Sequence, residues 1–242
     1  MIDLINILLL IAAVIVGGVI VSIMDGLRQK KMIKIMLSFS GGFLLSIAFV
    51  HFLPELYESH APYSIGIFIL IGFLIQLFLE YFSGGIEHGH IHIHKNNRVP
   101  WSLFISLSIH SFIEGIPLAG GDAHAQHGHL SAQSLLLGIL FHQTPVAIAL
   151  MTLLKGSGLS TKKSWLILIL FGIMTPIGLL FGKFFHNSID LLPMNLLLAI
   201  VVGMFLHIST TIIFEASENH RFNLVKLLSI IVGVTLAILI GG

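Results

Sequence analysis

Eight long apolar blocks follow one another along this chain and leave few folds open to it. A helix that crosses a bilayer needs roughly 20 mostly apolar residues. Backbone that lies in hydrocarbon must satisfy its hydrogen bonds within helices or a closed barrel. The blocks predict spans over 4–24, 35–55, 63–82, 100–121, 132–154, 164–184, 192–214 and 223–241. We therefore expect an all-α integral membrane protein, an eight-transmembrane-helix bundle that forms a single transmembrane domain over 1–242, with no soluble domain.

Composition supports this class. Hydrophobic residues make up 56% of the chain and charged residues only 10%, whereas a soluble domain is about one quarter charged. The 24 glycines suit close helix–helix contact in a membrane. The absence of cysteine excludes disulfides and thiolate metal sites, so any metal must be held by imidazole, carboxylate, hydroxyl or carbonyl groups.

Lysine and arginine are distributed unequally among the predicted links, and this sets the orientation. Eleven of the 12 fall after spans one, three, five and seven: Arg28, Lys30, Lys31, Lys34, Lys95, Arg98, Lys155, Lys162, Lys163, Arg221 and Lys226. Lys183 alone lies on the opposite side. Basic links stay in the cytoplasm, so the bias predicts an even number of spans and two non-cytoplasmic termini.

Ionisable residues near the middle of spans four and five are the clearest functional signal. His110 and Glu114 are four residues apart and share one face of a helix. His142 lies near the centre of the next span, so neighbouring antiparallel helices bring all three to one depth. Ionisable groups inside a membrane are costly and mark functional sites. Two imidazoles and one carboxylate are ligands for a divalent transition metal.

Structural roles are the alternative. Either histidine by itself could be a packing residue hydrogen-bonded to serine, and Glu114 could be protonated. The prolines argue for an ion path, since Pro117 and Pro145 cannot donate to the carbonyls of Ile113 and Phe141. Each would leave a backbone oxygen beside the three ligands. Pro176 in span six would likewise release the carbonyl of Gly172.

Longer motifs surround these residues. Span four reads His110-Ser111-Phe112-Ile113-Glu114-Gly115, similar to His-Asn-x-x-(Asp/Glu)-Gly, and span five reads His142-Gln143-Thr144-Pro145-Val146-Ala147, similar to His-Glu-x-Pro-(His)-(Glu). Span two carries Gly41, Gly42, His51, Pro54 and Glu55, and span six carries Thr175, Pro176 and Gly178. Together with eight spans, outward termini and a His-rich link after span three, these motifs resemble the ZIP family of divalent metal transporters over the whole chain.

The resemblance implies a metal site at His110, Glu114 and His142, and the departures from the family pattern modify it. The family's fourth ligand position, one turn after His142, is Val146 here. The positions of its adjacent second site are Ser111 and Gln143, which are neutral. We therefore expect one ion, held by two imidazoles and one carboxylate, with water or a released carbonyl completing its shell. The site keeps a net charge of +1, which disfavours tight binding in a low dielectric.

Transport of a divalent transition metal into the cytoplasm is the function that these features favour. The resemblance puts zinc (Zn²⁺, as transported substrate) first; iron, manganese, cobalt and cadmium also suit the ligands. A non-transporting metal sensor or degenerate relative is the main alternative, because Val146 and Gln143 have replaced ligands. An intramembrane metalloenzyme is the third, but there is no His-Glu-x-x-His and no general base beside His142, so we do not expect an enzyme.

The remaining histidines cluster in two links. The cytoplasmic link over 83–99 carries His88, His90, His92 and His94, and the outer link carries His124, His127 and His129. Both sets are candidates for loop metal binding; the alternative is a mobile polar loop with incidental affinity. Candidates for the entrance path are His51 and Glu55, and for the exit path Glu80 and His207.

The expected partners are the divalent ion and the lipid bilayer, with a homodimer as the candidate assembly and no role for nucleic acid. The compact chain without long links favours a bacterial inner membrane.

Overall fold

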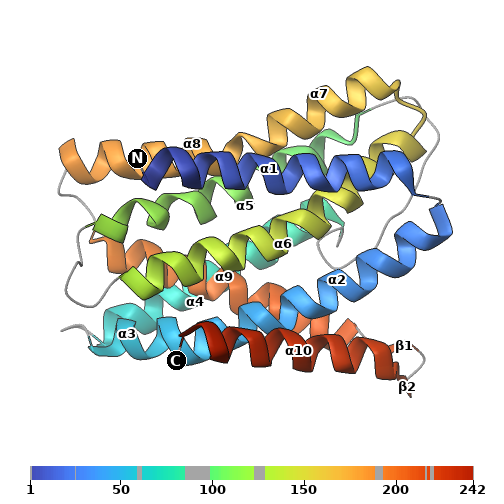
Figure 1. The fold of residues 1–242 in the computed structure, drawn as a ribbon. Helices are drawn as coiled ribbons and strands as arrows, with labels where there is room; N and C mark the ends of the chain where they lie inside the picture. Colours follow the sequence, from blue (N-terminus) through green and yellow to red (C-terminus); the bar gives the residue numbers. More distant parts are fainter. Residues whose placement is uncertain are drawn as a thin grey trace.

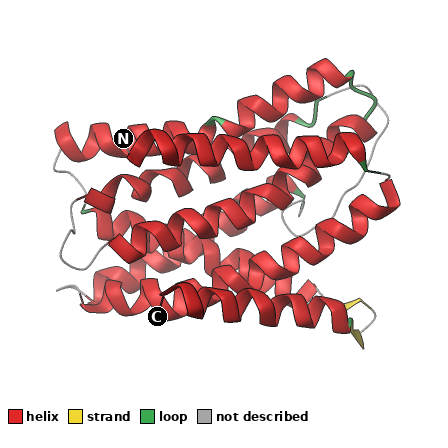
Figure 2. Ribbon diagram, in the orientation of Figure 1, coloured by secondary structure: helices red, strands yellow, loops and turns green. Residues whose placement is uncertain are grey.

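The computed structural model describes residues 2–24, 26–58, 62–84, 99–122, 129–188, 193–215, 217–218 and 221–241. Apart from one two-residue strand pair, the regular elements in this part of the chain are helices (Figures 1 and 2). The elements are α1 (Ile2–Ile23), α2 (Gly26–Ile47), η1 (Ala48–Phe52), α3 (Leu53–Glu58), α4 (Pro62–Ser83), α5 (Trp101–Gly115), η3 (Ile116–Asp122), α6 (His129–Gly156), α7 (Thr161–Gly172), α8 (Met174–Ser188), α9 (Met194–Glu215), β1 (Ser217–Glu218), β2 (Arg221–Phe222) and α10 (Leu224–Gly241).

The helices have the length and composition of membrane spans. Within the described ranges, seven helical runs are long and apolar enough to cross a bilayer, and the apolar part of α10, Leu224–Ile240, is shorter. Large apolar side chains such as Leu70, Leu74 and Phe78 are half or more exposed. Exposed apolar area on this scale would be a liability in water but matches a lipid-facing surface. The protein is an all-α integral membrane protein, as the apolar blocks predicted.

Helices that are distant in sequence pack in pairs across the bundle. α10 runs along α2, α9 along α4, α6 along α1 and α8 along α5. The two termini lie toward the same end of the bundle, and the β1–β2 hairpin lies at the other (Figure 1). The described helix ends that flank the predicted cytoplasmic links lie at that second end (Figure 1), which agrees with an even number of crossings.

Glycines allow α4 and α9 to approach each other closely. A Cβ placed on Gly72 would overlap the carbonyl oxygen of Ile200, and one placed on Gly203 would overlap the carbonyl oxygen of Ile69. The two contacts are reciprocal, so neither helix can carry a larger residue there without moving away from the other. This approach fixes the relative placement of the polar side chains on α4 and α9.

The second predicted span differs from the observed helix. Helix α2 begins at Gly26, and the helical run continues through η1 and α3 to Glu58, well beyond 35–55 at its N-terminal end. Lys31 and Lys34 therefore lie on exposed helical positions, not in a loop. Long lysine side chains extend from a helix end to the interface, so basic residues did not end this helix. Segment η1 is a π-helical turn that contains His51.

Prolines interrupt the fourth and sixth predicted spans. Helix α5 ends at Gly115, and the chain continues as the 3-10 segment η3 around Pro117. The N–H of Ile116 donates to the carbonyl of Ile113, so the expected release of that carbonyl was wrong; a tightened turn occupies it. Around Pro176 the sixth span divides into α7 and α8 at Ile173. Helix α6, in contrast, runs through Pro145 without a break.

Candidate metal site

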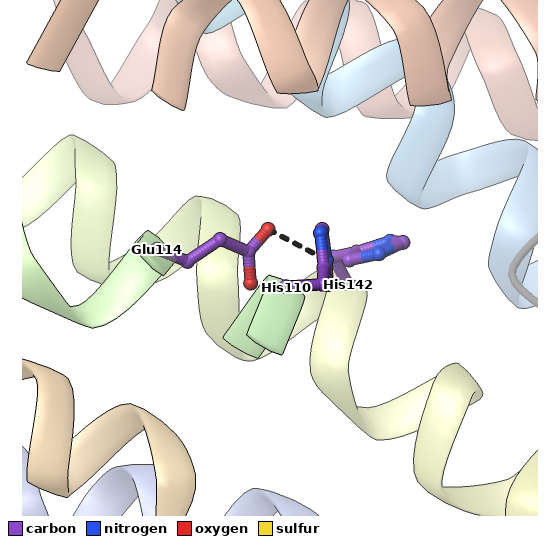
Figure 3. Close-up of side chains that lie close together, drawn as sticks. All are labelled: His110, Glu114 and His142. Carbon is purple, nitrogen blue, oxygen red and sulfur yellow. Dashed lines mark ion pairs between the residues drawn. The ribbon is translucent and has the colours of Figure 1, made fainter. Parts of the chain in front are cut away.

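His110, Glu114 and His142 come together in the interior of the bundle. His110 and Glu114 project from one face of α5, and His142 projects from α6 (Figure 3). One potential ligand atom from each residue lies within 4.8 Å of the others. All three side chains are at most 2% exposed. Within the described part of the chain, this is the one group of three or more histidines, cysteines or carboxylates close enough to share an ion.

The geometry within this triad suits one metal ion. Nε2 of His110 lies 3.1 Å from Oε1 of Glu114. The two imidazole rings have centroids 5.8 Å apart and an interplanar angle of 79°. Bonds of about 2.0–2.2 Å from zinc to nitrogen or oxygen place two tetrahedral ligands about 3.3–3.6 Å apart. The His110–Glu114 separation is slightly below that range, and the four-residue spacing on α5 keeps the two side chains adjacent.

Two side chains on other helices hold the imidazole rings. Nδ1 of His110 lies 2.8 Å from Oε1 of Gln76 on α4. Nδ1 of His142 lies 3.4 Å from Oγ of Ser40 on α2. An amide oxygen only accepts, so Nδ1 of His110 is the donor in this contact, and Nε2 would then offer its lone pair to a metal ion. Contacts of this kind fix the tautomer and orientation of histidine ligands.

The residues at the family's other ligand positions also lie in the interior. Ser111, Gln143 and Val146 are buried. Nε2 of Gln143 donates to Oγ1 of Thr175 on α8 at 3.0 Å, and its Oε1 is buried without a hydrogen-bond partner among the described residues. Val146 belongs to the apolar core. This side of the triad therefore offers neutral oxygens and no second carboxylate.

The predicted entrance residues are not part of the triad. Nε2 of His51 lies 3.3 Å from the backbone oxygen of Ala237 on α10. His51 and Glu55 are both partly exposed. The loop histidines His88, His90, His92, His94, His124 and His127 lie outside the described residues, as does the side-chain environment of His129.

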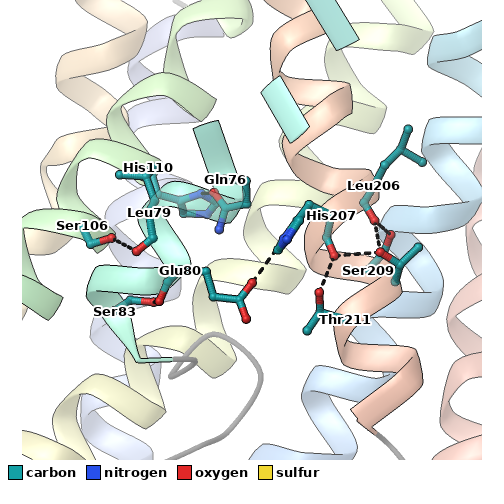
Figure 4. Close-up of polar contacts among 11 residues, drawn as sticks. Gln76, Leu79, Glu80, Ser83, Ser106, His110, Leu206, His207, Ser209 and Thr211 are labelled. Carbon is teal, nitrogen blue, oxygen red and sulfur yellow. Dashed lines mark hydrogen bonds and ion pairs between the residues drawn. The ribbon is translucent and has the colours of Figure 1, made fainter. Parts of the chain in front are cut away.

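The predicted exit residues form a pair of their own. Nδ1 of His207 on α9 lies 3.3 Å from Oε2 of Glu80 on α4, and their side chains are 6% and 21% exposed. Figure 4 shows this pair beside Gln76 and His110. Glu80 follows Gln76 by four residues, one helical turn along α4.

Sequence reasoning missed Gln76 and Ser40. The signal for Gln76 was present: it is a lone amide deep in an apolar segment, and a buried amide in a membrane helix needs a polar partner. Ser40 offered no comparable signal, since serine in a membrane helix commonly bonds to its own backbone, as Ser38 does to the carbonyl of Lys34.

The fold and the triad together define a polytopic α-helical membrane protein with three buried side chains that could hold a metal ion. The family described as ZIP Zinc transporter matches residues 2–100 and 85–241. The chain therefore belongs to the ZIP zinc transporter family, a family of transporters and not of enzymes. A relative, "Zinc transporter foi" of Drosophila melanogaster, is 26% identical over 148 residues, which are 60% of this chain and 20% of that protein. The chain thus spans about one fifth of the length of that relative.

Proposed function

We propose that this protein carries a divalent transition metal ion, zinc first, across the membrane into the cytoplasm, and that the ion binds at His110, Glu114 and His142. The observation that carries the proposal is the convergence of these three buried side chains, from α5 and α6, within 4.8 Å. Membership of a zinc transporter family supports the substrate.

The chemistry of the triad suits an ion that must be both captured and released. Imidazole nitrogen and carboxylate oxygen are ordinary zinc ligands and also bind iron(II), manganese, cobalt and cadmium. One carboxylate leaves a bound divalent ion with a net charge of +1, which limits affinity where the dielectric is low. Water, or the buried Oε1 of Gln143, would complete the shell.

The remaining parts of the proposal concern direction and setting. Inward transport is inferred from the family likeness, and the basic links define which end of the bundle is cytoplasmic. We place the chain in a bacterial inner membrane as one transmembrane domain, since its links are short. The described helices contain no second set of three ligands that would serve as an alternative main site.

Zinc uptake into proteoliposomes tests the proposal, with wild type compared with His142→Ala. Uptake by wild type that disappears in the variant is expected. Ile109→Ala is the matched control, because Ile109 is adjacent to His110 on α5 but 43% exposed on the outer face of the bundle; it should transport like wild type. Absence of uptake by wild type across zinc, iron, manganese and cadmium would overturn the transport function and favour a metal-sensing role. Full uptake by His142→Ala would overturn the site.

A further inference from the structure

A second His–Glu pair, Glu80 with His207, lies in the bundle outside the triad. It joins two helices, α4 and α9, that are packed closely at Gly72 and Gly203. Both residues fall on the half of their helices nearer the end that the basic links predict to be cytoplasmic. Glu80 is the third residue before the end of α4 at Ser83.

The spacing of this pair fits two ligands of one ion. Nδ1 of His207 and Oε2 of Glu80 are 3.3 Å apart. A charge-assisted hydrogen bond between such atoms is shorter, about 2.7–2.9 Å. Two ligands on a tetrahedral zinc, each about 2.0–2.2 Å from the metal, are about 3.3–3.6 Å apart. The pair therefore has a separation similar to that of the triad's own His110–Glu114 contact, which is 3.1 Å.

Packing fixes the imidazole of His207. The ring of Phe73 on α4 lies edge-on to it, with centroids 4.7 Å apart and an interplanar angle of 72°. The hydroxyls of Thr210 and Thr211 donate to the backbone oxygen of His207 and not to its ring. The ring is thus oriented by an apolar neighbour, and its Nδ1 is directed at Glu80.

Gln76 contacts the triad and shares helix α4 with Glu80 of the pair. Its Oε1 contacts Nδ1 of His110 at 2.8 Å, and Glu80 follows one turn later on the same helix. With a rise of about 1.5 Å per residue, Glu80 lies about 6 Å nearer the end of α4 than Gln76. Polar side chains therefore follow one another from His110 past Gln76 to Glu80 and His207, across α5, α4 and α9 (Figure 4), and Glu114 contacts His110 at the other end.

Hydration, more than charge, favours movement of an ion from the triad toward Glu80 and His207. The triad and the pair each offer one carboxylate, so Coulomb attraction does not favour one position strongly over the other. Exposure differs: Glu114 is 1% exposed, whereas the Glu80 side chain is 21% exposed. An ion at Glu80 regains water, and hydration of a divalent cation is the largest favourable term in leaving a buried site.

We propose that Glu80 and His207 form a second, weaker site for a divalent transition metal, which receives the ion from the triad before its release into the cytoplasm. The receiving role rests on the proposed function, but binding of the metal to this pair does not. Glu80 and His207 supply one ligand each, and water completes the coordination.

Thiol protection tests binding directly, because the chain contains no cysteine and Glu80→Cys introduces a single thiol. In the purified full-length protein, cadmium should slow maleimide labelling of Glu80→Cys by about tenfold or more. Protection should be lost in Glu80→Cys/His207→Ala and retained in Glu80→Cys/His142→Ala, which lacks a ligand of the triad. Equal protection with and without His207, or none in Glu80→Cys, would overturn the second site. Loss of protection with His142→Ala would also contradict it as an independent site.

Uptake kinetics test the native side chains. They distinguish a metal site from a contact that only holds α4 and α9 together. Glu80→Gln keeps an oxygen that can contact His207 but removes the negative charge. A release site predicts a maximal rate about tenfold lower, with KM for external zinc nearly unchanged, because capture occurs at the triad. A purely structural contact predicts wild-type kinetics, and that result would overturn the receiving role. Inactive wild-type protein would instead contradict the proposed function, while the labelling result would stand.

Discussion

The triad and the Glu80–His207 pair contain the same chemical groups but are built in different ways. His110 and Glu114 are four residues apart on α5, so the helical repeat places them on one face, where their side chains are 3.1 Å apart. Glu80 and His207 lie far apart in sequence and reach 3.3 Å because α4 and α9 are closely packed. The first contact is local and fully buried; the second is tertiary and partly exposed. Sequence spacing within one helix thus brings His110 and Glu114 together, whereas the packing of two helices brings Glu80 and His207 together.

The largest expected effect concerns the carboxylate of the triad. Glu114→Ala removes the negative charge that offsets a buried divalent ion, so zinc uptake into proteoliposomes should fall to the rate of protein-free vesicles. Glu80→Ala should slow uptake but leave it measurable, because the partly exposed pair can be replaced by water. Full uptake by Glu114→Ala would contradict the triad, and equal loss in both variants would erase the distinction between the two regions.

Gln76 contacts the triad at His110 and lies one helical turn from Glu80, and its removal should weaken the triad. Gln76→Leu deletes the acceptor at Nδ1 of His110, so the ring loses its fixed tautomer. Loss of such a contact costs about 10–100-fold in metal affinity, which zinc titration of the purified protein would measure. Gln76→Glu, which keeps an acceptor, is the control and should bind at least as tightly as wild type. Unchanged affinity in Gln76→Leu would show that His110 is oriented by other contacts.

Val146 offers a way to make the triad bind more tightly than the pair. Val146→Glu places a carboxylate one turn after His142 and would cancel the remaining positive charge of the bound site. Zinc affinity should rise by about tenfold, corresponding to about 1.4 kcal/mol, and release should become slower. The same affinity as wild type would show that position 146 does not face the ion.

The smallest expected effect on binding comes from the packing of α4 on α9. Gly72→Ala would force its Cβ against the carbonyl oxygen of Ile200, at a cost of about 1–3 kcal/mol. Gly66→Ala on the same helix is the matched control, since the nearest atom, Oη of Tyr57, would be 3.6 Å away. Gly72→Ala should lower the melting temperature and reduce cadmium protection of Glu80→Cys. Equal melting temperatures for the two variants would contradict the close approach.

Much of the fold could be predicted from sequence because hydrocarbon restricts the chain so strongly. Apolar length predicted the helices, and the four-residue spacing of His110 and Glu114 predicted their contact. Helix ends were less predictable: Lys31 and Lys34 lie within α2, since lysines at the interface do not stop a helix. Pro117 ended α5, but Pro145 did not end α6, because the effect of proline depends on packing around it.

The contacts of Gln76 and Ser40 could not be predicted in the same way. Each joins a triad histidine to a helix from another part of the chain. Such contacts depend on which helices are neighbours and how each is rotated about its axis. A single sequence predicts the length of an apolar helix well. It predicts the rotation of the helix about its axis poorly when apolar residues cover all of its faces.

The π-helical turn at Ala48–Phe52 determines how the residues after it are rotated about the helix axis relative to α2. In an uninterrupted α-helix, His51 would come about three turns after Ser40, at about 3.6 residues per turn, and the two side chains would be stacked in one line. Ser40 contacts His142, so that line leads toward the ion site. A π turn takes in about one additional residue and rotates the rest of the helix, and His51 meets the backbone of α10 at Ala237. The one additional residue in the π turn thereby rotates the imidazole of His51 away from the helix face that carries Ser40.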